Sequence, residues 1–97
     1  MATYILLVKF TTQGVKDIKG SPARLDAFKQ LCKKMGAEFK SFHLTMGRYD
    51  IVGVVDAPED ATIAKIILAL SSGGNVSTET LRAFSEAEYR SIVAALP

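Results

Sequence analysis

Apolar residues gather into four stretches that have the spacing of β-strands. Thr3 to Phe10 is a nearly continuous apolar run, the pattern of a central strand that is covered on both faces. Residues from about Ala37 to Met46 and from Tyr49 to Asp56 are expected to form a second and a third strand, and Val76 to Phe84 a fourth. The pattern therefore predicts a four-stranded sheet.

Three stretches have helical spacing instead. The first helix begins at Ser21-Pro22, an N-cap followed by proline at the first helical position, and ends at Gly36, which suits a left-handed C-terminal cap. The second begins at Pro58-Glu59-Asp60, and the third covers Glu86 to Leu96. Thr11 to Gly20 is interpreted as a polar connection between the first strand and the first helix.

The segment Gly47-Arg48 predicts a tight turn between the second and third strands. A two-residue hairpin loop of type II′ favours glycine at its first central position, where φ is positive. This register places Leu44 opposite Ile51 and His43 opposite Val52. Alternation then predicts two faces, with Phe42, Leu44, Met46, Tyr49, Ile51, Gly53 and Val55 on one and Phe39, Ser41, His43, Thr45, Asp50, Val52 and Val54 on the other.

The order of the elements, β-α-β-β-α-β with a terminal helix, predicts an α+β protein with a ferredoxin-like fold and an antiparallel sheet. Two helices would cover one face of that sheet. Apolar residues that include Ile5, Leu7, Val52 and Val54 would remain on the other face, and a soluble monomer rarely exposes so large an apolar patch. We therefore expect a homodimer, or a higher assembly built from dimers.

The segment Met46-Gly47-Arg48-Tyr49-Asp50-Ile51-Val52 resembles the signature of the GYD family of small bacterial ferredoxin-like proteins. The resemblance extends over nearly the whole chain, which is expected to form one domain over residues 1–97. It implies a dimeric α+β barrel. In that superfamily the space between the sheet and its partner, or between the sheet and the helices, often holds a small organic ligand. The resemblance implies no particular reaction.

Composition narrows the range of partners. The net charge is +2 and the basic residues are spread along the chain, which argues against nucleic-acid binding. No apolar stretch approaches the ~20 residues of a membrane span, and the N-terminus lacks a charged lead and a cleavage site, so no membrane partner is expected. The single cysteine, Cys32, fits a cytoplasmic location and is interpreted as a buried structural thiol.

His43, the only histidine, is the main candidate for catalysis. It shares a predicted face with Asp50, and a carboxylate diagonal to an imidazole can orient it as a general base. The alternative is a histidine that is hydrogen-bonded inside the dimer interface, because buried polar groups need partners whether or not they react. No cofactor or metal is expected, since one histidine without a nearby cysteine or suitably spaced carboxylates does not form a metal site.

Candidate ligand-binding residues are Thr45, Arg48, Tyr49 and Arg82. Tyr49 is expected to pack on the apolar face, under the helices or at their rim. Arg48 is either solvated at the turn tip or reaches a carboxylate, including one of a second chain. Arg82 would anchor an anionic ligand if its strand face points inward, or would pair with a carboxylate across the dimer. Asp50, alternatively, ties down the turn through local hydrogen bonds.

Three functions remain open. The first is a small-molecule-binding or regulatory homodimer whose barrel or sheet-helix pocket holds an aromatic or anionic metabolite. The second is a cofactor-independent monooxygenase or isomerase of the dimeric α+β barrel type, with His43 as the base, and it rests on analogy of fold. The third is a dimer whose role is purely structural or interactive.

Overall fold

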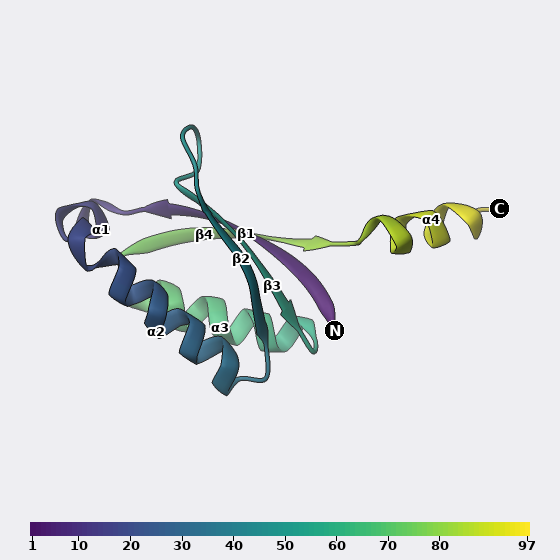
Figure 1. Ribbon diagram of the computed structural model, residues 1–97, viewed down its shortest axis with the longest axis horizontal. Helices are drawn as coiled ribbons and strands as arrows, with labels where there is room; N and C mark the ends of the chain where they lie inside the picture. The colour runs from purple at the N-terminus through teal and green to yellow at the C-terminus, as the bar shows by residue number, and fades with distance from the viewer.

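The computed structural model describes residues 1–97 and shows an antiparallel sheet of four strands in the order β2-β3-β1-β4. The strands are β1 (Ala2–Phe10), β2 (Glu38–Leu44), β3 (Ile51–Ala57) and β4 (Val76–Ala83). The helices are α1 (Thr12–Lys16), α2 (Ser21–Lys34), α3 (Asp60–Ser72) and α4 (Glu86–Ala94). The predicted α+β, ferredoxin-like arrangement with an additional C-terminal helix is confirmed (Figure 1).

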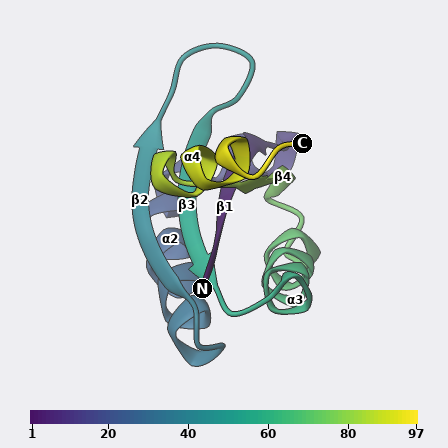
Figure 2. The same ribbon diagram turned by 90° about the vertical axis from the view of Figure 1, so that its right-hand side faces the viewer.

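Helices α2 and α3 lie on the same side of the sheet, toward its opposite edges (Figure 2). Their apolar faces and the side chains of alternate strand residues form the core. In β1 these alternate residues are Tyr4, Leu6 and Val8, and they pack with Val55, Phe28, Cys32, Ile63 and Ile66. We call this side of the sheet the helix face.

No helix covers the other side of the sheet, which we call the open face (Figures 1 and 2). Its register places Ile5 beside Val54 and Leu81, and Leu7 beside Val52. These side chains are only partly buried or exposed. The expectation that an apolar surface remains on the second face is therefore confirmed.

The hairpin has the predicted register, with His43 opposite Val52 and Leu44 opposite Ile51. The face predicted for Phe39 was wrong. A register shift between Phe39 and Ser41 inserts an extra residue into β2, so Phe39 lies opposite Val55 on the helix face. The predicted two-residue type II′ loop was wrong. β2 ends at Leu44 and β3 begins only at Ile51, so residues 45–50 form a longer turn that the Thr45 N–H closes on the oxygen of Asp50 at 2.8 Å.

Thr11 to Gly20 is more ordered than the predicted polar connection, because it contains α1 and a 3₁₀ turn over Ile18–Gly20. The hydroxyl of Thr11 accepts the N–H of Gly14 at 3.1 Å and caps α1. Gly14 packs against the start of β4, where a Cβ atom would lie 2.1 Å from the carbonyl oxygen of Asn75. Only glycine permits this approach, so the segment is anchored to the loop before β4.

Only the C-terminal end of α2 agrees with the prediction. Gly20, not Ser21, is the N-cap residue, and Ser21 is the first residue of the helix. At the other end Gly36 has a φ of +78°, which is the left-handed conformation predicted for it. None of the helices is long and apolar enough to cross a membrane.

Candidate functional site

A cavity lies between the helix face of the sheet and the two helices α2 and α3, and we call it the sheet-helix cavity. Its volume is about 410 Å³, within the range of small-molecule sites. Its lining is mostly apolar and comes from several elements: Leu6, Val8, Phe10, Ser21, Pro22, Arg24, Leu25, Ala27, Phe28, Leu31, Phe39, Phe42, Ile51, Gly53, Ala69, Leu70, Gly73, Asn75 and Val76.

Small residues leave this space free. Gly53 lies in the middle of β3, opposite Leu6 and Phe42, and contributes no side chain to the sheet surface. A Cβ atom there would make ordinary van der Waals contacts, with the carbonyl oxygen of Ser41 at 3.7 Å and Cζ of Phe39 at 4.0 Å, so Gly53 has room for a methyl group. Alanines on α2 and α3 add to the effect.

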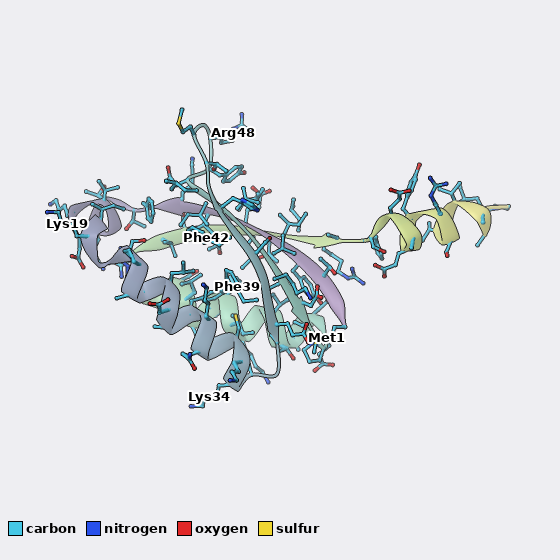
Figure 3. The ribbon with its side chains drawn as sticks, viewed as in Figure 1. Met1, Lys19, Lys34, Phe39, Phe42 and Arg48 are labelled. Atoms are coloured by element: carbon cyan, nitrogen blue, oxygen red, sulfur yellow. The ribbon has the colours of Figure 1, made fainter.

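Aromatic rings form one wall of the cavity. Phe28 of α2 and Phe39 of β2 meet edge to face, with ring centroids 5.8 Å apart and ring planes at 82°. Figure 3 shows Phe39 between β2 and the helices. This packing depends on the extra residue in β2, because without it Phe39 would lie on the open face.

Three polar residues line the cavity: Ser21, Arg24 and Asn75. A guanidinium N–H of Arg24 donates to the backbone oxygen of Asp17 at 3.0 Å and to its carboxylate at 3.1 Å. The amide oxygen of Asn75 accepts a hydrogen bond from Gln13 at 3.1 Å. The other guanidinium nitrogen of Arg24 donates to the backbone oxygen of Gly14 at 3.5 Å, so the Thr11–Gly20 segment fixes two of the polar groups, and Arg24 pairs there with the exposed carboxylate of Asp17.

The sequence-predicted candidates lie elsewhere, and none of them lines the sheet-helix cavity. Asp50 accepts the backbone N–H of Phe10 at 2.9 Å through its carboxylate. The hydroxyl of Thr45 donates to the backbone oxygen of Tyr49 at 2.6 Å. Both side chains therefore hold the turn together. His43 is exposed on the open face, and its assignment with Asp50 as a catalytic pair stays a prediction.

The predicted side for Tyr49 was wrong. Its hydroxyl donates to the carboxylate of Glu79, which lies opposite Leu7 and therefore on the open face. This hydrogen bond to a carboxylate, with a smaller contribution from burial, raises the pKa of Tyr49. The alternation of β3 begins only at Ile51, so it does not determine the side of Tyr49.

The two arginine candidates are both exposed. Arg48 lies at the tip of the turn, away from the helices (Figure 3). Arg82 lies opposite Tyr4 on the helix side of the edge strand β4. Its guanidinium carbon is 4.4 Å from the ring centroid of Phe84 and 5.8 Å from that of Tyr4. An edge position allows this charge to remain in solvent.

Two buried side chains near the core have raised pKa values. Tyr4 donates its hydroxyl to Asp60 at the start of α3, and this hydrogen bond is the main reason that the pKa of Tyr4 is raised. Burial raises the pKa of Cys32 to about 11, so the thiol is inert at neutral pH. The interpretation of Cys32 as a buried thiol is confirmed. No cluster of three His, Cys, Asp or Glu side chains is placed to hold a metal ion.

Comparison with known proteins identifies similar chains. The family model of the GYD domain matches residues 4–93. A glutamine synthetase and cystathionine beta-lyase binding protein of Thermus thermophilus is 35% identical over 89 residues, which cover 91% of this chain and 94% of the relative. A feast or famine regulatory protein from M. tuberculosis, solved in complex with L-methionine, has a TM-score of 0.66 at 15% identity. That match covers 88% of this chain and 51% of the other, so this chain spans about half the length of the regulator, and the likeness is one of fold.

Proposed function

The chain belongs to the GYD domain family, and we propose that this member is a small-molecule-binding, regulatory homodimer whose ligand lies in the sheet-helix cavity. The observation that carries the proposal is the cavity itself, about 410 Å³ in volume, mostly apolar, and lined by few polar groups. A pocket of this size without a ligand would lose packing contacts that a core of close-packed side chains normally retains. A ligand would restore those contacts.

The lining defines the class of ligand. The aromatic and aliphatic walls suit an apolar body, either a ring or a short branched chain. Arg24 offers a cation, and a guanidinium pairs well with a carboxylate. We therefore propose a small carboxylate with an apolar side group, such as an apolar amino acid or an aryl acid. This class overlaps with the aromatic or anionic metabolite expected from the sequence.

The similar proteins support a binding role. The Thermus thermophilus relative is named for the two enzymes that it binds, and the feast or famine regulatory protein was solved with an amino acid. Neither name describes a catalyst. L-methionine is accordingly one of the first compounds to test against this chain, although the low identity of that neighbour supports only the fold.

Calorimetric titration with L-methionine, L-phenylalanine and phenylacetate tests the proposal. We expect saturable binding by the wild type and a loss of at least about tenfold in affinity for Gly53→Leu, because the new side chain would occupy the cavity. Val54→Leu is the matched control, since the adjacent residue points to the open face. Absence of binding by any apolar carboxylate, or equal binding by Gly53→Leu, would contradict the cavity assignment.

The role of Arg24 is tested separately. Arg24→Gln should weaken carboxylate binding by about tenfold or more and leave the binding of the corresponding uncharged amide nearly unchanged. Asp17→Asn is the control, because it removes the ion pair but keeps the arginine. If both ligands weaken equally in Arg24→Gln, the arginine supports the local fold and does not recognise the carboxylate.

A second candidate function is the binding of a metabolic enzyme. It rests on the Thermus thermophilus relative, whose 35% identity extends over nearly the whole of both chains. Analytical ultracentrifugation of this protein mixed with glutamine synthetase from the same cells tests it. Co-sedimentation that saturates at a fixed stoichiometry would support the enzyme-binding role, and independent sedimentation at micromolar concentration would count against it.

A further inference from the structure

Helix α4 is an amphipathic arm with no buried residue. It extends from the end of β4 and stands away from the sheet and from α2 and α3 (Figure 1). Along one side it carries Tyr89, Ile92 and Val93, which are 61%, 46% and 46% exposed, and Leu96, which is 64% exposed, follows two residues after its end. Isolated helices of this length are marginal in water, so the apolar stripe needs a surface to cover it.

The connection to β4 sets the direction of this arm. Only Phe84 and Ser85 separate β4 from α4. Ser85 and Glu88 form a capping box, with the two reciprocal hydrogen bonds at 2.9 and 3.1 Å, and the Arg82 guanidinium stacks on Phe84. Because this link is short and fixed, α4 extends past the end of the sheet at which β4 finishes, and not over its own open face.

The charges of α4 are satisfied within the helix. Arg90 pairs with Glu86 at 2.9 Å, and Glu88 is used in the capping box. The apolar stripe therefore carries no charge that would have to be stripped of water when another apolar surface covers it. This favours an apolar protein surface as the occupant.

The turn of the β2-β3 hairpin presents a surface of that kind. It contains Met46, which is 99% exposed. Leu44 is 71% exposed but pairs with Ile51 and lies on the helix-face side of the hairpin, so Met46 is the apolar side chain that the turn itself offers. The turn rises on the side of the sheet opposite to α2 and α3 (Figures 1 and 2). It lies beside the Val8 end of β1, whereas the arm leaves from the Thr3 end, opposite Ala83. The turn and the arm are therefore at opposite ends of the sheet.

In the face-to-face homodimer of the proposed function, we propose that α4 of each copy docks on the β2-β3 turn of the other copy. A two-fold axis that reverses the strand direction brings the turn of one copy to the arm of its partner at both ends. A two-fold axis parallel to the strands would instead place the two β2-β3 turns at the same end of the dimer. Both turns rise toward the partner, so they would collide there. The reciprocal arrangement avoids that conflict.

The area is adequate for a stable pair. Four strands about seven residues long present a face of roughly 19 by 23 Å, or on the order of 400 Å². A nine-residue helix adds a stripe of roughly 14 by 10 Å. Each copy buries this area twice, once on its own α4 and once where the partner's α4 docks. The sum approaches the roughly 800 Å² that each partner buries in a stable interface. This inference rests on the homodimer in the proposed function and is independent of the cavity.

Cross-linking of cysteine variants tests the arrangement. Met46→Cys and Val93→Cys are prepared separately in the full chain and treated with a short bis-maleimide, alone and after mixing and subunit exchange. Cys32 is buried and protonated at neutral pH, so it does not compete. We expect a covalent dimer in the mixture, at least about ten times more abundant than with either variant alone. A dimer formed by either variant alone would overturn the arm-to-turn contact and leave the homodimer standing.

Sedimentation equilibrium gives an independent readout. Ile92→Glu places a charge on the apolar stripe and should raise the dimer dissociation constant by about tenfold or more. Ala94→Glu is the matched control on another side of the same helix and should change it by less than about threefold. Equal effects of the two variants would overturn the docking of the stripe. A wild type that remains monomeric at micromolar concentration would overturn this inference and the proposed homodimer, while the calorimetric test of the cavity would still stand.

Discussion

The carboxylate of Asp50 accepts the backbone N–H of Phe10 at 2.9 Å and so attaches the hairpin turn to the end of β1. The backbone N–H of Asp50 in turn donates to the oxygen of Val8 at 2.8 Å. The side chain thereby extends the ladder between β1 and β3 beyond Ile51. Because Phe10 lines the sheet-helix cavity, the turn also helps to fix the wall of the proposed binding site.

Asp50→Ala should destabilise the fold, because it leaves the N–H of Phe10 without its charged acceptor. Hydrogen bonds to charged groups contribute about 1.5–3 kcal/mol, so we expect a loss in that range in the free energy of unfolding. Asp50→Asn, which keeps an oxygen acceptor, should lose less, and Asp26→Ala on the exposed side of α2 should be nearly neutral. Urea denaturation measures all three. Equal stability of Asp50→Ala and the wild type would remove the structural role of this carboxylate.

Gly47→Ala should destabilise the hairpin through its backbone alone. Gly47 has a φ of +144°, and no atom lies within 4 Å of the place where a Cβ would be. A residue with a side chain at such a φ costs about 1–3 kcal/mol. Gly53→Ala is the control, since it also has room for a Cβ but its φ is not positive. Thermal melting should show a lower Tm for Gly47→Ala only, and identical melting of the two variants would disprove the assigned turn conformation.

Cys32 should make the protein less stable at alkaline pH. Its pKa is raised from 9.0 to about 11 by burial, so the folded state holds the thiol proton more tightly than the unfolded state does. The stabilisation is fully present below pH 9 and is lost as the pH rises from 9 toward 11, by about 2–3 kcal/mol in all. Urea denaturation at pH 8, 9, 10 and 11 should show this decline in the wild type and a shallower one in Cys32→Ala. Parallel curves would show that the thiol does not titrate in this way.

His43→Ala distinguishes an interface role from a catalytic one. Since His43 is exposed on the open face that a second copy would cover, we expect a weaker dimer, an unchanged monomer fold and unchanged ligand binding in the cavity on the other face. Sedimentation equilibrium and calorimetry measure these quantities on one variant. An intact dimer that has lost ligand binding or turnover would instead favour His43 as the base of a cofactor-independent enzyme, with Asp50 as its partner.

Local sequence signals predicted the parts of the fold that local chemistry determines. Gly47 predicted the place of the turn but not its length, and the predicted pairing of His43 with Val52 is confirmed. Gly36 predicted the end of α2. The alternation in β1 and β3 also predicted which apolar residues remain on the open face. Each of these features depends on residues that are neighbours in sequence or are related by one hairpin register.

Features that depend on distant contacts were not predicted. The extra residue that moves Phe39 to the helix face follows from its packing against Phe28, on a different element. Tyr49 was placed on the wrong side because its partner, Glu79, is 30 residues away in sequence. Order in Thr11–Gly20 depends on the contact between Gly14 and Asn75. The sheet-helix cavity is lined by strands, helices and loops together, and its only sequence signal is a glycine in the middle of the apolar strand β3.

Amide chemical shifts of the ¹⁵N-labelled protein, recorded while an apolar carboxylate such as L-methionine or phenylacetate is titrated in, test the central claim most directly. If the ligand lies in the sheet-helix cavity, the largest shift changes will be at Phe28, Gly53 and Leu70, which line it from α2, β3 and α3. Residues of the open face, such as His43 and Val54, will change little. Changes concentrated on His43 and Val54, with Phe28 and Leu70 unaffected, would contradict the assignment of the binding site to the cavity.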